Sequence, residues 1–330
     1  MTRPPLELVC PAGTPAALRV AVDTDADAVY VGFRDETNAR NFPGLNFSRA
    51  ELEKGIAYAH GRGSKVFVAI NTLPRAGDPG PWRRAVDDAV ALGADALILA
   101  DIGLLAYAAD MHPATRRHLS VQASASNAEA IRFYRDAFGI ARVVLPRVLT
   151  VEDIARLIVE TDVETEIFAF GGMCVMAEGR CTLSSYATGL SPNNCGVCSP
   201  ASHVRFERVD DGLAVHLGAF TLDLVADDSA AGYPTLCKGR FVAHGAAGYL
   251  FEEPTSLNAL ALLPRLAAAG VTALKIEGRQ RGRAYVAEVV AAFREAVDAL
   301  ARGEASPPRA LEKIAEGRRG TAGAYEKGWR

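Results

Sequence analysis

Short apolar runs alternate with amphipathic stretches along most of the chain. Each run ends at Gly, Asn, Asp or Pro, which is the pattern of buried parallel strands separated by loops. Eight such runs are present, at residues 6–10, 28–33, 65–70, 96–100, 118–122, 142–145, 166–170 and 272–276. Helical spacing of apolar residues predicts helices between them, among others at residues 14–22, 82–92, 127–138, 151–160, 256–269 and 284–301.

This alternation of strands and helices predicts an α/β fold. Eight strand–helix units favour a TIM-like (β/α)8 barrel. A doubly wound open sheet is the alternative that the same pattern allows. In both folds ligands bind at the carboxyl ends of the strands, so polar residues that follow the predicted strands are candidates for a site.

The alternation is interrupted after the seventh strand. Residues 171–251 contain five of the six cysteines, many turn residues, and β-like pieces at 204–209 and 213–217. We therefore predict four segments: a first part of the barrel at 1–170, an inserted cysteine-bearing subdomain at 171–251, the closing strand and helices at 252–305, and a loose C-terminal extension at 306–330. Because the insertion leaves the carboxyl end of a strand, its cysteines should lie on the functional face.

Composition narrows the classes of function. Hydrophobic residues make up 49% of the chain and the formal net charge is -3, so no electrostatic footprint for autonomous nucleic-acid binding is present. The longest apolar stretch, 94–111, is interrupted by Asp95, Asp101 and Asp110, which argues against a transmembrane segment. We expect a cytoplasmic protein, where a reducing environment disfavours disulfides and the cysteines need another explanation.

The spacing of the cysteines indicates a metal or cluster site. Six residues separate Cys174 from Cys181, Cys195 and Cys198 form a CxxC pair, and Cys237 lies far downstream. Spacing alone favours the CxxC pair as ligands, because two thiolates so placed easily reach one metal. The pattern matches neither a zinc finger nor the common ferredoxin runs, and inert buried thiols are the other reading. A further cysteine, Cys10, ends the first strand and is expected to be a buried small side chain.

The residues around the first two of these cysteines resemble a known family. The stretches EIFAFGGMC at 166–174 and GRCTLS at 179–184 resemble the signature of the collagenase-like peptidase family U32. The resemblance extends through nearly the whole chain and includes CPAG at 10–13 and DADAVYVG at 25–32. Gly172 and Glu178 depart from the broad family signature, although Glu178 fits one branch of the family.

That branch takes part in ubiquinone biosynthesis. Its likeness rests on TNARNF at 37–42, GLNF at 44–47, ADALILAD at 94–101, SVQAS at 120–124, RVVLPR at 142–147 and KIEGR at 275–279. The resemblance implies oxygen-independent hydroxylation of the ubiquinone ring, in a heterodimer with a related UbiV-like protein. It also implies prephenate as the source of the hydroxyl oxygen and one [4Fe-4S] cluster. The matching ligands are Cys174, Cys181, Cys198 and Cys237, which leaves Cys195 as a spare thiol.

Other residues suggest how a substrate could be held. Arg40, Arg147 and Arg279 follow predicted strands, and arginine forks suit the two carboxylates of prephenate; surface ion pairing is the alternative for each. Lys275 and Glu277 lie on one side of the last strand and are expected to pair at the barrel mouth, with Glu277 as a candidate proton carrier and Lys275 as the other catalytic candidate. A purely structural pair is the alternative.

Peptidase activity is not expected. The chain has no HExxH or GxSxG motif, and its six histidines show no metal-ligand spacing. Two further functions remain open beside the hydroxylase subunit: a zinc-stabilised binding module without catalysis, and an RNA-base hydroxylation factor, since the broad family includes proteins that hydroxylate RNA bases.

Overall fold

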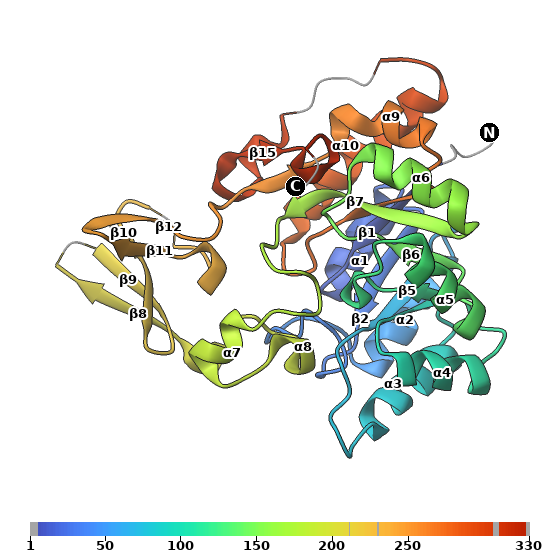
Figure 1. The fold of residues 1–330 in the computed structure, drawn as a ribbon, viewed down its shortest axis with the longest axis horizontal. Coiled ribbons are helices and arrows are strands. Elements are labelled where there is room, and N and C mark those ends of the chain that lie inside the picture. Colours follow the sequence, from blue (N-terminus) through green and yellow to red (C-terminus); the bar gives the residue numbers. More distant parts are fainter. Residues whose placement is uncertain (1–5, 211, 230, 306–309, 328–330) are drawn as a thin grey trace.

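The core of the protein is a closed barrel of parallel strands (Figure 1). The computed structural model describes residues 6–210, 212–229, 231–305 and 310–327. Within these residues the barrel strands are β1 (Glu7–Pro11), β2 (Ala28–Gly32), β3 (Lys65–Ile70), β4 (Ala96–Leu99), β5 (Arg117–Leu119), β6 (Arg142–Val144), β7 (Glu164–Gly172) and β14 (Ala273–Ile276). They pair in this order, and β14 pairs with both β1 and β7. This closure confirms the predicted barrel and excludes the open sheet.

Helices cover the outside of the barrel. They are α1 (Pro15–Asp23), α2 (Arg49–His60), α3 (Gly80–Ala91), α4 (Ile102–Met111), α5 (Ala128–Phe138), α6 (Val151–Thr161), α9 (Leu263–Ala268) and α10 (Arg283–Ala301). Local signals set their starts: the Thr14 hydroxyl accepts from the Ala17 amide, and Ser48 with Glu51 forms a capping box. Apolar residues between strands and helices form the main core, which includes the fully buried Cys10.

One predicted helix is wrong at its start. Residues 256–258 form strand β13 (Ser256–Asn258), and the helical part begins only with the short η4 (Leu260–Leu262) and α9. The strand forms because β7 extends beyond the barrel to Gly172, where its exposed edge pairs antiparallel with β13. A second short strand, β15 (Gly320–Thr321), then pairs with β13.

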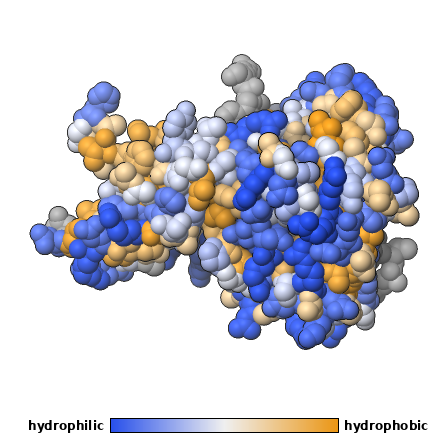
Figure 2. All heavy atoms as spheres, turned by 90° about the horizontal axis from the view of Figure 1, so that it is seen from below, coloured by the Kyte–Doolittle hydropathy of each residue, from blue (hydrophilic) through white to orange (hydrophobic). Residues whose placement is uncertain are grey.

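The segment between β7 and β13 contains two short helices and two small sheets. The helices are α7 (Leu183–Thr188) and α8 (Pro192–Cys195). One sheet consists of β8 (Val204–Val209), β9 (Gly212–Leu217) and β10 (Phe220–Val225), and the other of β11 (Arg240–Ala243) and β12 (Ala246–Tyr249). The predicted strands at 204–209 and 213–217 correspond to β8 and β9. The two sheets form a lobe beside the barrel, and apolar side chains are exposed on it (Figures 1 and 2).

The C-terminal extension is not loose where the structure describes it. Leu311 and Tyr325 are each only 2% exposed, and the Tyr325 hydroxyl donates to the Phe168 carbonyl on β7 at 2.6 Å. The first and last parts of the predicted extension, 306–309 and 328–330, lie outside the described residues. Among the described helices, none combines the length and apolar character needed to cross a membrane.

Candidate functional site

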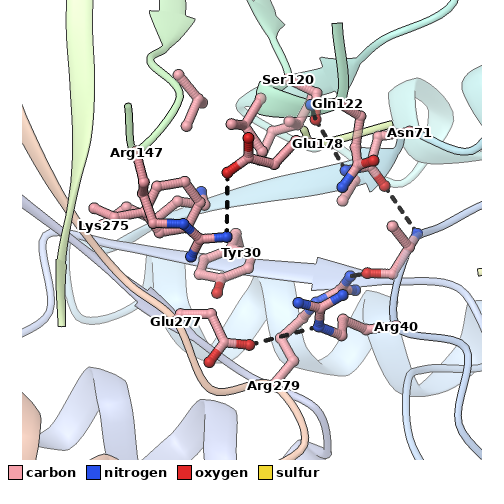
Figure 3. Close-up of a pocket in the computed structure, with 16 residues that line it drawn as sticks. Tyr30, Arg40, Asn71, Ser120, Gln122, Arg147, Glu178, Lys275, Glu277 and Arg279 are labelled. Carbon is pink, nitrogen blue, oxygen red and sulfur yellow. Dashed lines mark hydrogen bonds and ion pairs between the residues drawn. The ribbon is translucent and has the colours of Figure 1, made fainter. Parts of the chain in front are cut away.

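A charged pocket opens at the carboxyl ends of the barrel strands (Figure 3). Its empty space, counted together with the open mouth, is about 580 Å3. Its ionisable walls come from the loop after β2, from the residues that follow β6, β7 and β14, and from the end of β14 itself. They are Arg40, Arg147, Glu178, Lys275, Glu277 and Arg279. All five predicted pocket residues are therefore brought together.

Arg147 is held in the pocket wall. Its Nη2 lies 3.2 Å from Glu178 Oε1, and both side chains are 7% exposed. Its Nη1 donates to the Gly172 carbonyl at 3.2 Å, and its guanidinium lies over the Phe168 ring. The ion pair joins the loop after β6 to the segment that follows β7, so Arg147 already has a structural partner.

Arg279 organises the loop after β2. It is 3% exposed, and it donates to Asn38 Oδ1 at 3.0 Å, Asn46 Oδ1 at 3.2 Å and the Ala39 carbonyl at 2.8 Å. Gly32 gives it room, because a Cβ there would lie 2.4 Å from Arg279 Nη1. Burial lowers the pKa of Arg279 to about 10, so the group stays a cation near neutral pH.

The predicted pairing of Lys275 with Glu277 is wrong. Lys275 Nζ lies 2.6 Å from Glu166 Oε1 in the barrel interior and 3.8 Å from the centre of the Tyr30 ring. Glu277 instead faces Arg40 and accepts a hydrogen bond from Gln280 at 3.0 Å. The register of β14 against β7 shifts between Lys275 and Ile276, and Glu277 lies beyond the end of the strand. The strict alternation that the prediction assumed therefore does not continue to Glu277.

Arg40 lies between the pocket and the cysteines. Its Nε is 3.5 Å from Glu277 Oε1, and its side chain is 30% exposed. Burial alone would lower the pKa of Arg40, but Glu277, Cys198 and Cys174 act together to raise it above its ordinary value. The barrel pocket and the cysteine-bearing segment thus meet at this side chain.

The four predicted ligand cysteines come from separate stretches of the segment after β7. Cys174 follows β7, Cys181 precedes α7, Cys198 follows α8, and Cys237 lies in the short helix η3 (Leu236–Lys238). Burial raises the pKa of the Cys198 thiol, and Cys174 and Cys181 raise it further. Burial, then Cys174, also raise the pKa of Cys237, to about 11.

The fifth cysteine of this segment has a local contact. Cys195 Sγ points to the Val197 carbonyl at 3.7 Å. It is half-buried at the end of α8. Its CxxC neighbour Cys198 has Cys174 and Cys181 as electrostatic partners.

The donor set fits a cluster better than a single ion. Among the described residues, no three His, Cys, Asp or Glu side chains lie close enough together to hold one metal ion. Four thiolates on one tetrahedral zinc would lie roughly 4 Å apart, given Zn–S bonds of about 2.3 Å. An iron–sulfur cubane binds each thiolate through a different iron and so accommodates wider spacing. In this structure Cys198 interacts electrostatically with Cys174 and Cys181, and Cys237 with Cys174, so the four thiols lie in one region beside Arg40.

Glycine contacts join the cysteine segment to the barrel loops. Gly196 has φ +78, and a Cβ there would lie 2.1 Å from the Asn38 carbonyl oxygen. Its own carbonyl accepts from the Asn41 amide at 3.3 Å. The turn that precedes Cys198 therefore packs directly on the loop that carries Arg40.

We expect Gly196→Ala to destabilise the protein more than Gly189→Ala. Gly189 has a similar φ of +73, but a Cβ built there would have no atom within 4 Å. Gly189→Ala should therefore lower the free energy of unfolding only by what an alanine loses in the left-handed backbone conformation, about 1 kcal/mol. The added cost at Gly196 comes from the clash with Asn38. Urea unfolding of both variants measures the difference, and equal losses would show that this contact does not matter.

Among the polar pocket residues that were not predicted are Asn71, Ser120, Gln122 and Glu178. Asn71 accepts from the Ala39 amide and donates to Ser120, so it bridges three loops at the pocket rim. Gln122 also lines the pocket, and Glu178 pairs with Arg147. Asn71 and Gln122 could have been found, because Asn71 follows one predicted strand and Gln122 ends another. The pairing of Glu178 depends on the path of the segment after β7, which no local pattern reveals.

The chain belongs to peptidase family U32, whose model matches residues 13–328. It is 33% identical to tRNA hydroxylation protein P of Escherichia coli, over 93% of this chain and 71% of that protein. It is 31% identical to the 23S rRNA 5-hydroxycytidine C2501 synthase of the same organism, over 89% of this chain and 40% of that protein. A collagenase of Porphyromonas gingivalis is 28% identical, over 90% of this chain and 66% of that protein.

Among solved structures, the U32 peptidase Mk0906 is similar over 52% of this chain and 70% of that chain, with 18% identity and a TM-score of 0.42. The strand pairing described above, rather than this likeness, establishes the barrel. Several of the sequence relatives are thus named as hydroxylation proteins, which agrees with a hydroxylation role.

Proposed function

We propose that this chain is an iron–sulfur subunit required for oxygen-independent hydroxylation of the ubiquinone ring, in a role like that of UbiU. It would act with a UbiV-like partner and use prephenate as the hydroxyl source. The observation that carries the proposal is the position of Arg40, which faces Glu277 in the pocket and the thiols of Cys198 and Cys174. The sequence likeness to the ubiquinone branch of the family supports the choice of substrate.

Each part of the site has a place in this function. Cys174, Cys181, Cys198 and Cys237 would hold the [4Fe-4S] cluster, which supplies electron transfer when bound. The cationic pocket walls suit an anionic donor. In the net exchange the ring C–H becomes C–OH while the donor's C–OH becomes C–H, so the electrons balance without an external oxidant. The chain's own residues bind and orient both molecules and limit the access of water.

RNA-base hydroxylation is the second candidate. It is supported by the names of the relatives that act on tRNA and rRNA. This chain spans 71% and 40% of those two proteins, so parts of them have no counterpart in the alignment. The net charge of -3 also disfavours RNA binding by this chain alone.

We expect a deletion strain to lose ubiquinone when grown without oxygen and to keep its hydroxylated RNA nucleosides. The measurement is quinone profiling of anaerobic cultures, together with nucleoside analysis of digested tRNA and rRNA. Complementation with the intact gene is the control. Normal anaerobic ubiquinone would overturn the quinone assignment, and loss of hydroxylated nucleosides would favour the second candidate.

A further inference from the structure

We propose that Arg40 binds a carboxylate of the pocket's ligand. In doing so its guanidinium leaves Glu277 and pairs with the carboxylate of the ligand instead. The proposal rests on the proposed function for the identity of the ligand, prephenate, but not for its chemical class. It singles out one of the four pocket cations. The four cations differ in how firmly the protein holds them.

Three of the four cations are already committed to close contacts. Arg147 contacts Glu178 and the Gly172 carbonyl, each at 3.2 Å. Lys275 contacts Glu166 at 2.6 Å and is 6% exposed. Arg279 bonds three oxygens of the loop after β2 at 2.8–3.2 Å. A ligand that recruited the bonded nitrogens of these cations would have to break buried, charge-assisted hydrogen bonds, which are among the stronger contacts in proteins. Arg147 and Arg279 each have one unpaired nitrogen, Nε, but it is fully buried and out of reach of a ligand in the pocket.

Arg40 differs in both its contact and its exposure. Its contact with Glu277 is 3.5 Å long, beyond the usual distance of a charge-assisted hydrogen bond. Its side chain is 30% exposed, against 7% for Arg147. The guanidinium therefore has free hydrogen-bonding capacity at the pocket wall, and a planar carboxylate matches its fork.

The backbone of Arg40 is held in a strained conformation. Its φ is +148, a region that residues with a side chain rarely adopt. The Arg40 amide donates to the Asn38 carbonyl at 3.1 Å, and the Arg40 carbonyl accepts from the Asn46 side chain at 2.8 Å. Such strain persists only where the surroundings hold it, and here the fixed backbone places a partly exposed side chain at the pocket wall.

Glu277 has other partners that can keep it when Arg40 leaves. Its carboxylate accepts from the Gln280 side chain at 3.0 Å and from the Gly172 amide at 3.3 Å. Its own carbonyl accepts from the Tyr285 hydroxyl at 3.0 Å, which fixes its backbone. The exchange therefore leaves no buried carboxylate without hydrogen bonds, whereas separation of Arg147 from Glu178 would.

The test is calorimetric titration of the full chain, purified without oxygen, with prephenate and with two simple carboxylates, pyruvate and benzoate. We expect Arg40→Gln to weaken carboxylate binding at least tenfold and Arg40→Lys to recover only part of it, because lysine lacks the planar fork. Glu277→Gln should tighten binding severalfold, since it removes both the competing partner and a repelling charge. Arg265→Gln, at an exposed arginine of α9 that pairs with Glu152 of α6, is the matched control and should bind as the wild type does.

Opposite results would overturn the proposal. These are unchanged binding in Arg40→Gln, weaker binding in Glu277→Gln, or no binding of any of the three carboxylates to the wild type. Circular dichroism checks folding, and if Arg40→Gln does not fold, the tightening in Glu277→Gln decides. If the protein binds the simple carboxylates but not prephenate, prephenate is excluded as the donor and the role of Arg40 in carboxylate binding stands. If carboxylate binding depends on Arg40 but the deletion strain makes normal ubiquinone without oxygen, only the proposed role in ubiquinone synthesis is excluded.

Discussion

Serine at position 174, 181, 198 or 237, introduced one site at a time, should remove most of the iron and the visible absorbance from protein purified without oxygen. A thiolate is a soft ligand that binds iron–sulfur clusters, and a serine hydroxyl does not replace it. Each of the four cysteines comes from a different part of the segment after β7, so none of the four lies next to another in the sequence and could take its place. Iron analysis and the absorbance spectrum are the measurements, with about four irons per chain expected in the wild type.

Cys195→Ser is the matched control for this series. It lies in the same segment, but its thiol points to the Val197 carbonyl, so iron and absorbance should be retained. Loss of the cluster in this variant, with retention in Cys237→Ser, would show that the CxxC pair supplies the ligands. Colourless protein that contains one zinc would favour the zinc-stabilised module instead.

Most of the barrel could be predicted because its signals are local. The strand at 65–70 is predicted with its exact bounds, and Thr14 caps α1 through the Ala17 amide as its position suggests. Buried parallel strands read as continuous apolar runs, and cap residues act within one turn of a helix. Closure of the barrel could be predicted from the number of strand–helix units, since eight units are enough to join β14 to β7.

The errors occur where a distant partner decides the structure. Residues 256–258 have a helical pattern, but the free edge of β7 recruits them as a strand. Tyr325 belongs to a tail without apolar periodicity, yet it is buried against Phe168 of β7. Propensity and periodicity describe a segment alone, and tertiary contacts override them.

The sequence predicted which charged residues line the pocket, but not which of them pair with one another. Strand-end positions correctly brought Arg40, Arg147 and Arg279 to one pocket. The sequence could not distinguish Arg40 from the other two, because the difference lies in contacts with residues far along the chain. Glu178 is the clearest case: it lies 31 residues after Arg147 and meets it only because the segment after β7 folds back over the pocket.

Below the pocket, a group of charged residues fills the end of the barrel that is opposite the cysteines, and its removal should strongly affect stability. Arg142 lies 2.5 Å from Glu7, 2.7 Å from Glu164 and 3.3 Å from Glu166. Its side chain is 6% exposed, and that of Glu166 is fully buried. Glu166 also holds Lys275 of the pocket. The group thus supports the pocket floor from inside the barrel.

We expect Arg142→Met to lower the free energy of unfolding by about 3–5 kcal/mol at neutral pH, because it leaves buried carboxylates without their main counter-charge. Urea unfolding measures this. Arg132→Met is the control, since Arg132 pairs with Glu129 on the surface of α5 and such pairs contribute little. Little change in Arg142→Met would show that Lys65 and Lys275 are sufficient counter-charges for Glu7 and Glu166.

The loss should also depend on pH in a defined direction. Burial alone would raise the pKa of Glu7, but Arg142 and Lys65 hold it below its ordinary value of 4.5, and Arg116 and Arg142 do the same for Glu164. A carboxyl whose pKa is lowered by folding contributes stability above its unfolded pKa and loses that contribution as the pH falls through its folded pKa. The difference between wild type and Arg142→Met should therefore be largest near neutrality and shrink below about pH 4. A difference that stays constant into acid would mean that lost packing of the arginine stem, rather than lost charge, causes the destabilisation.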